Sequence, residues 1–231
     1  MKRILALVVI VCSALLSSCD SVSIGIIGGS DGPTSVIVAE NEEQTSNLND
    51  IDKYFKDNYV DKQKLPILDI NIENPVVSDD RILVLDDTIE NNLELLIYEY
   101  YKNLMSGSFE DVKEIIADGS LLASNDAYEN NFKEGIYYSK IEIDEIELID
   151  KDDLDEIAIK NKQAIVKKIN DLKMTEFAIV EVDKTITHNE KALSMVPQVG
   201  NGDVTRYFVL GKKDDKYKIV EVYWEGFMSD Q

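Results

Sequence analysis

Cysteine and histidine are almost missing from this chain of 231 residues, which has two cysteines and a single histidine, His188. Both cysteines, Cys12 and Cys19, lie near the N-terminus. We therefore expect no disulfide framework, thiolate zinc site or redox thiol pair in the rest of the chain. One imidazole without further soft ligands also predicts no transition-metal site. No residue pattern indicates a cofactor.

Basic residues are too few to balance the acids, with 24 Lys and Arg against 45 Asp and Glu and a net charge of −21. Such a field repels the phosphates of nucleic acids and anionic lipid headgroups. A nucleic-acid partner is therefore not expected. The hydrophobic fraction of 44% and the eleven tyrosines are nevertheless sufficient for a folded core.

Long apolar runs are also scarce, and the longest uncharged one covers residues 4–16, after Lys2 and Arg3. It is shorter than the ~20 residues that span a bilayer, but it has the length of a signal-peptide core. The run ends in Leu16-Ser17-Ser18-Cys19, which resembles the bacterial lipobox: an aliphatic residue, two small residues and the cysteine that is acylated.

The lipobox resemblance implies that residues 1–18 are a signal peptide, which is cleaved off before Cys19. It also implies that the sulfur of Cys19 carries acyl chains, which attach the protein to the membrane. Several acyl chains hold a protein stably where one does not. The predicted location is the extracytoplasmic face of the cell membrane. Residues 1–18 contain two basic residues and no acid, so their removal would leave a net charge of −23. The alternative is an ordinary secretory signal with a chance cysteine.

Residues 23–35 read Ser-Ile-Gly-Ile-Ile-Gly-Gly-Ser-Asp-Gly-Pro-Thr-Ser. This run resembles a signature of the membrane β subunit of sodium-translocating decarboxylases, in which the acid matching Asp31 takes part in sodium passage. That subunit surrounds its ion path with many membrane spans, and no such spans are expected here after the leader. We therefore do not transfer the pump activity. The segment is interpreted as a glycine-rich tether or as a docking segment for a membrane partner.

The chain divides by composition into four parts: the signal peptide (1–18), an anchor and glycine-rich segment (19–39), an acidic tether with possible short strands (40–86) and a globular domain (87–231). Within the tether, residues 40–61 are the most acidic and polar part, and we expect a spacer there. The short apolar runs between residues 65 and 85 are candidate strands.

Three helices are predicted at the start of the globular domain. Asp87 and Glu90 have the spacing of a capping box, and apolar residues then recur at helical period from 89 to 105 until Gly107. Ser108 is expected to cap a second helix that ends at Gly119, and a third follows at about 121–134.

Strands dominate the rest of the domain. Apolar residues 141 and 143 alternate in one parity and 146 and 148 in the other, which predicts a β-bulge at Asp144-Glu145. A helix over about 152–169 and strands over 174–187, 203–211 and 216–225 follow, the last two joined as a hairpin.

The expected fold class is α+β, with helices packed on a bent antiparallel sheet. The run 207–224 (Tyr-Phe-Val-Leu-Gly-Lys-Lys-Asp-Asp-Lys-Tyr-Lys-Ile-Val-Glu-Val-Tyr-Trp) resembles the end of nuclear transport factor 2-like domains. That resemblance would cover residues 87–227 and implies a cone-shaped sheet that wraps a long first helix. The helix at 152–169 would be an insertion.

Three groups of residues are candidates for chemistry. Acids at 150–156 could begin a calcium loop, but the glycine and the final glutamate of an EF-hand are missing, and a helix N-terminus explains them better. His188 is expected to be an exposed loop residue without a partner nucleophile. Five aromatic residues could line the mouth of a cone-shaped pocket or could be ordinary core; they are Tyr207, Phe208, Tyr217, Tyr223 and Trp224.

We therefore predict no catalytic residue and a lipid attachment at Cys19. The predicted function is that of an extracytoplasmic lipoprotein acting as a non-enzymatic binding or structural module for a protein or small ligand. Two alternatives stay open: an accessory protein of a sodium-translocating decarboxylase, and an enzyme that uses a cone-shaped pocket.

Overall fold

The computed structural model describes residues 44–117, 119–197, 199–224 and 226–228, with side chains from residue 50 onward. The predicted signal peptide, Cys19 and the segment 23–35 lie outside the described residues. None of the described helices is both long enough and apolar enough to cross a membrane.

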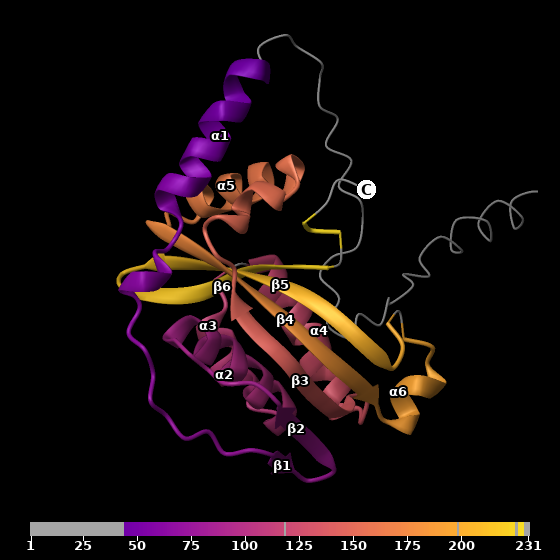
Figure 1. The fold of residues 1–231 in the computed structure, drawn as a ribbon. Coiled ribbons are helices and arrows are strands. Elements are labelled where there is room, and N and C mark those ends of the chain that lie inside the picture. Colours follow the sequence, from indigo (N-terminus) through magenta and orange to yellow (C-terminus); the bar gives the residue numbers. More distant parts are fainter. Residues whose placement is uncertain (1–43, 118, 198, 225, 229–231) are drawn as a thin grey trace, which may run out of the picture.

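The described residues form an α+β fold, as predicted, in which helices pack on one six-stranded sheet (Figure 1). The strands are β1 (Val76–Ser78), β2 (Arg81–Leu85), β3 (Tyr138–Leu148), β4 (Glu176–His188), β5 (Gly202–Lys213) and β6 (Lys216–Tyr223). The helices are α1 (Gln44–Asn58), α2 (Asn92–Ser106), α3 (Phe109–Ile115), α4 (Gly119–Lys133), α5 (Ile159–Asp171) and α6 (Glu190–Ser194), with short 3-10 turns η1 (Lys62–Lys64) and η2 (Asp153–Glu156).

The sheet is mixed rather than purely antiparallel. Its strands follow chain order from β1 to β6, and every neighbouring pair is antiparallel except β2 and β3. The parallel pair arises because α2, α3 and α4 connect β2 to β3, and a parallel pair needs such a crossover. The predicted bulge is confirmed by a register shift between Ile143 and Glu145, and further shifts lie between Tyr138 and Lys140 and between Val209 and Leu210. Bulges of this kind increase bend and twist.

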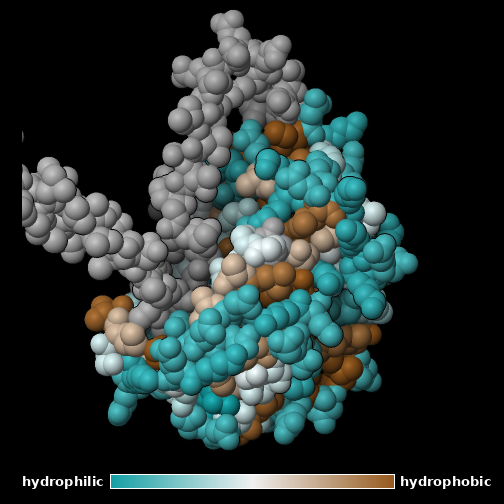
Figure 2. Space-filling view, turned by 180° about the vertical axis from the view of Figure 1, so that it is seen from behind, coloured by the Kyte–Doolittle hydropathy of each residue, from teal (hydrophilic) through white to brown (hydrophobic). Residues whose placement is uncertain are grey.

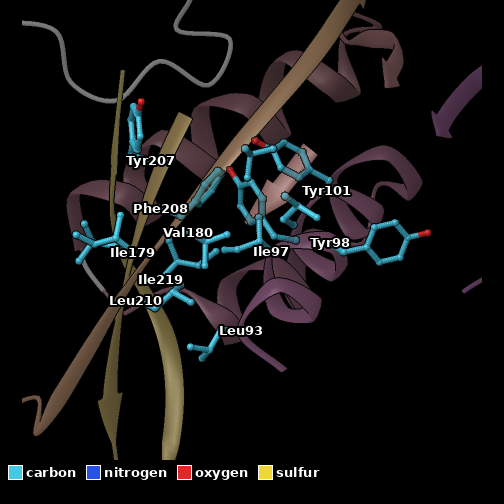
Figure 3. Close-up of a cluster of buried hydrophobic side chains, with 14 of the residues drawn as sticks. Leu93, Ile97, Tyr98, Tyr101, Ile179, Val180, Tyr207, Phe208, Leu210 and Ile219 are labelled. Atoms are coloured by element: carbon cyan, nitrogen blue, oxygen red, sulfur yellow. The ribbon is translucent and has the colours of Figure 1, made fainter. Parts of the chain in front are cut away.

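Different helices pack on the two faces of the sheet. Successive side chains of each strand point to opposite faces, so each strand contributes to both contacts. On β4, Val180 and Lys184 face α2 and α4, whereas Phe177 faces α1 and α5. Figure 3 shows Leu93 and Ile97 of α2 against Val180, Phe208 and Ile219 of the sheet. The surface of the molecule, seen from behind relative to Figure 1, is mostly hydrophilic, with separate apolar areas (Figure 2). A hydrophilic surface is expected for a chain with many acidic residues.

Helix α2 begins four residues later than the expected capping box at Asp87. The N-cap is Asn91, whose side chain accepts hydrogen bonds from the backbone N–H groups of Leu93 and Glu94. Asp87 instead accepts from the backbone N–H of Ile146 on β3, at 3.0 Å. The predicted end is confirmed: Gly107 adopts φ 79°, a left-handed conformation that glycine favours.

Other helix boundaries also differ from prediction. Ser108 precedes α3, but its side chain makes no capping hydrogen bond. Gly119 begins α4 instead of ending α3, which already stops at Ile115. The helix expected over 152–169 is divided into η2 and α5, and Ala158 is the residue that precedes α5. The boundary predictions were wrong because α3 and α4 are close in sequence. A glycine between two such helices can end the first or begin the second, and the local sequence does not distinguish these cases.

The expected spacer over residues 40–61 contains helix α1, which packs on the folded body through residues 52–56. Phe55, Tyr59 and Val60 are buried, and the ring of Phe55 meets that of Phe177 edge to face at 4.7 Å between centroids. The hydroxyl of Tyr59 donates to the backbone oxygen of Ile149 at 2.7 Å. The end of α1 and the residues directly after it are therefore packed structure rather than a spacer, because Phe55 on the helix and Tyr59 and Val60 beyond it are buried.

Candidate functional site

A partly open pocket lies between the α2–α4 layer and the sheet. Its volume is about 40 Å³, which is room for a few water molecules, since about 10–15 Å³ suffices for one. Helices α2 and α4 and strands β3 to β6 supply its wall, together with the residue after β6. The lining residues are Tyr100, Tyr101, Leu121, Ser124, Tyr138, Ile141, Lys184, Ile186, Val204, Arg206, Phe208, Val222 and Trp224.

Two cations sit in this mostly apolar wall. Lys184 of β4 and Arg206 of β5 are 6% and 7% exposed. The register pairs Lys184 with Val204, so Arg206 lies two residues along the neighbouring strand, on the same face of the sheet. Among the described lining residues there is no Asp or Glu. The described wall of the pocket therefore contains two basic side chains, in a chain whose net charge is −21.

Lys184 is the less satisfied of the two cations. Its ammonium lies 5.0 Å from the centre of the Tyr101 ring, and within the described ranges it has no hydrogen-bond or ion-pair partner. Arg206 donates to the backbone oxygen of Thr205 at 2.7 Å and stacks over the Trp224 ring at 3.4 Å. The neighbouring acid, Asp183, faces away on the other side of the sheet, where Thr205 donates to it.

Burial makes the charged form of Lys184 costly. It holds the pKa of the ammonium well below its usual range; Arg206 adds to the decrease, whereas Asp183 opposes it. The hydroxyls of Tyr101 and Tyr138 stay protonated at neutral pH, because burial raises the pKa of both. These tyrosines therefore carry no negative charge that could balance the ammonium of Lys184.

Replacing Lys184 with methionine is expected to stabilise the domain by on the order of 1 kcal/mol or more at neutral pH, because an uncompensated buried charge is removed. Unfolded lysine titrates near pH ~10.4, above the lowered folded pKa, so the unfolded state binds more protons between the two values. The penalty that Lys184 imposes therefore grows as the pH falls through this window and vanishes above it. Urea unfolding of both proteins across this pH range tests this: a gain from Lys184→Met that does not shrink toward high pH contradicts it.

His188 is not the exposed loop residue that the sequence suggested. It is the last residue of β4 and is 3% exposed, and its ring lies tilted against that of Tyr138, with 4.7 Å between centroids. Asn201 Oδ1 accepts from the backbone N–H of His188 and faces its Nδ1 at 3.1 Å. Since a carbonyl oxygen only accepts, Nδ1 carries the proton and Nε2 is an acceptor, which has no partner. Burial lowers the pKa of the imidazole, and Asn201 partly opposes this.

A second buried polar side chain lies on α4. Among the residues that the structure describes, neither the amide nitrogen nor the amide oxygen of Asn125 has a hydrogen-bond partner, and the residue is 5% exposed. In a helix Asn125 shares a face with Leu121, which lines the pocket, because residues four apart lie above one another. Unsatisfied buried polar groups are uncommon in folded proteins and often mark sites of water or ligand.

The predicted aromatic cluster is divided by the structure. Phe208 and Trp224 line the pocket. Tyr207 and Tyr223 face the other side of the sheet, where both rings pack on Phe227. Tyr217 is at the far end of the hairpin and donates its hydroxyl to Glu176. Adjacent residues of a strand point to opposite faces, so the cluster in sequence could not be one cluster in space.

The acidic run at 150–156 brings no metal ligands together. Asp155 pairs with Lys56 of α1 at 2.7 Å. In the described part of the chain no group of three or more His, Cys, Asp or Glu residues is arranged to hold a metal ion.

The sequence prediction did not include Lys184 and Arg206 among the candidate site residues, although the sequence around Lys184 contains an indication of its position. In the run 180–186, Val180, Val182 and Ile186 alternate as inward residues, and Lys184 interrupts this series. A charged residue at an inward position of a buried strand is a candidate binding residue.

No family model matches the chain, and no curated protein or solved structure matches it at a significant level.

Proposed function

We propose that this chain is an extracytoplasmic lipoprotein whose α+β domain binds a small ligand in the pocket between the α2–α4 layer and the sheet. The observation that carries the proposal is Lys184, a buried ammonium that has no counter-ion among the described residues and lies in a pocket lined by aromatic rings. A structural core gains nothing from such a group, since burying an unpaired charge costs free energy. A binding site does gain, because the ligand supplies the missing partner.

We further infer that the domain has the cone shape of nuclear transport factor 2-like proteins. In support, α2 is long and packs across one face of the sheet, and bulges in β3 and on the β5–β6 pair fall where a sheet would have to bend. The parallel strand β2 and the helix α5 between β3 and β4 would be additions to that plan.

Trp224 allows the binding proposal to be tested directly. It is the only tryptophan of the sequence and lines the pocket, so its emission should change saturably when a ligand enters. Small-molecule mixtures from culture medium and cell extract are titrated onto the full chain in detergent. Ser124→Phe, which fills the pocket from α4, should abolish any saturable change, whereas Ser120→Phe, exposed on the same helix, should not. A response that survives Ser124→Phe contradicts binding in this pocket.

The anchor is tested by metabolic labelling with palmitate. The native chain should be labelled and recovered with membranes, whereas Cys19→Ala should lose the label completely, because the thiol is the acceptor of the lipid. A matched Cys12→Ala chain should keep the label, since Cys12 falls within the segment predicted to be removed. Equal labelling of the native and Cys19→Ala chains would contradict the lipoprotein assignment.

A further inference from the structure

We propose that the ligand of this pocket is a short-chain monocarboxylate, held by an ion pair between its carboxylate and the Lys184 ammonium. This inference rests on the proposed binding function and adds the chemical class of the ligand. Three properties of the pocket lead to it: its charge, its size and the character of its wall.

The charge selects an anion. Lys184 lies in the wall of the pocket, and the described lining residues contain no acid that could neutralise its ammonium. A cationic or neutral ligand would leave the Lys184 ammonium buried without a counter-ion, so its entry would not offset the cost of burying that charge. A carboxylate satisfies the ammonium through a charge-assisted hydrogen bond, which is stronger than a neutral one.

The size selects a small molecule. A cavity of about 40 Å³ holds roughly three waters when one needs about 10–15 Å³. A ligand that displaces them would have on the order of three to six non-hydrogen atoms. Acetate, propionate and butyrate fall in this range. Long-chain fatty acids, peptides and nucleotides do not.

The wall selects a ligand with an apolar part. Ile141, Ile186 and Val204 lie beside Lys184 on the sheet, and Phe208 and Val222 continue the apolar surface. An alkyl group of two or three carbons gains by leaving water for such a wall, at about 0.8 kcal/mol per buried methylene as a general value. Sulfate or phosphate gains nothing from it and would require many donors to replace its hydration. The hydroxyl of Ser124 already donates to the backbone oxygen of Ser120 at 3.2 Å, so Lys184 is the donor to which we assign the carboxylate.

The experiment compares propionate with its neutral isostere, propionamide, on the full native chain in detergent, by Trp224 emission and by thermal unfolding. Propionate should bind saturably and raise the unfolding temperature, because a ligand that binds only the folded state stabilises it. Propionamide should bind at least tenfold more weakly, since it has the same shape and no charge. Propionamide binding as tightly as propionate would overturn the proposal without any mutation.

Two variants test whether Lys184 supplies the positive charge that pairs with the carboxylate. Lys184→Met and Lys184→Gln should each weaken propionate binding at least tenfold while the domain stays folded, and Lys213→Met, an exposed lysine at the end of β5, should leave it unchanged. Undiminished binding in both Lys184 variants would overturn the assignment of that residue. Sulfate that competes as well as propionate would show an inorganic-anion site and would also overturn the monocarboxylate class.

Failure of this inference can be distinguished from failure of the proposed function. If no carboxylate binds but another small molecule changes Trp224 emission in a way that Ser124→Phe abolishes, the pocket binds a ligand of another class. If propionate binds and Ser124→Phe does not affect it, the carboxylate site is elsewhere and the pocket itself is excluded.

Discussion

Replacing Phe55 with alanine is expected to lower the free energy of unfolding of the domain by about 3–5 kcal/mol, the range for truncating a buried phenylalanine. The side chain is 1% exposed, its ring meets that of Phe177 edge to face, and the Lys162 ammonium lies 5.9 Å from its centre. Loss of the ring leaves a cavity between α1 and the sheet and removes the main apolar contact that holds this helix.

Helix α1 is also held by polar contacts, so the loss should not detach it completely. Lys162 of α5 pairs with Asp52 at 2.8 Å, and Tyr54 donates to Asn170 at 2.8 Å. Equilibrium unfolding in urea measures the change, with Lys53→Ala on the exposed side of the same helix as the control. A loss below about 1 kcal/mol would mean that α1 contributes little to the folded domain, in agreement with the spacer predicted from the sequence over residues 40–61.

Glu94→Gln should lower the free energy of unfolding by on the order of 3 kcal/mol, because one carboxylate serves three donors. Glu94 is 1% exposed and accepts from the backbone N–H of Glu90 at 2.7 Å, from the side-chain amide of Asn91 at 2.6 Å and from the backbone N–H of Leu148 at 3.3 Å. An amide has only one acceptor oxygen, and its NH₂ group would face a donor in place of the other.

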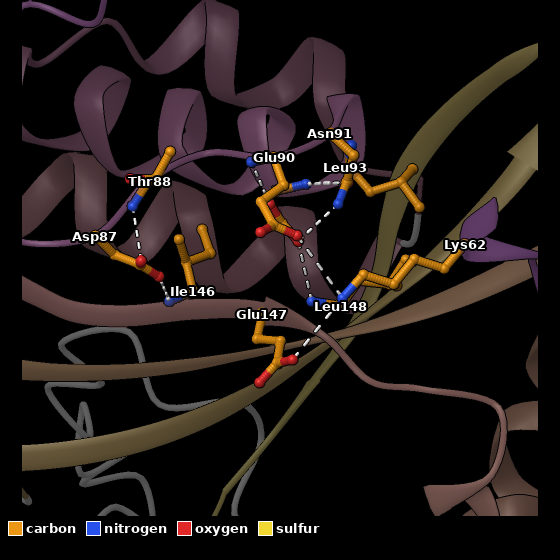
Figure 4. A network of polar contacts seen from close by, with 10 residues as sticks. Lys62, Asp87, Thr88, Glu90, Asn91, Leu93, Ile146, Glu147 and Leu148 are labelled. Carbon is orange, nitrogen blue, oxygen red and sulfur yellow. Dashed lines mark hydrogen bonds and ion pairs between the residues drawn. The ribbon is translucent and has the colours of Figure 1, made fainter. Parts of the chain in front are cut away.

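The same carboxylate connects the start of α2 to the end of β3, so its effect should reach beyond one helix (Figure 4). Buried hydrogen bonds to a charged group contribute about 1.5–3 kcal/mol each in general, without being additive. Thermal unfolding and amide exchange at Leu148 both measure the loss. Glu99→Ala is the control, since Glu99 pairs only with Lys102 on the same helix and is part-exposed, and its effect should stay within ~0.5 kcal/mol. Equal effects of the two variants would contradict the role of the network.

Local sequence patterns determined most of the secondary structure of residues 87–228. The 3.6-residue period predicted α2, the alternation predicted β4, β5 and β6, and the change of parity at Asp144-Glu145 predicted the bulge. These patterns succeed because burial of one face follows directly from helix or strand geometry. The acidic net charge and the scarcity of cysteine also follow from the sequence by itself.

Tertiary structure alone decided which polar residues became important. A local pattern places Asp87, Asn91 and Glu94 near one helix start, but only the approach of β3 selects Asn91 as the cap and gives Glu94 its third donor. In the same way, α1 is polar enough to resemble a tether, and only the contact with Phe177 of a distant strand shows that it is folded. Lys184 and Arg206 are about twenty residues apart in sequence, and the register of β4 with β5 brings them to one pocket. The local sequence determines which side chains of a short segment can be buried. Which segments contact one another depends on long-range packing, and the candidate site forms only through those contacts.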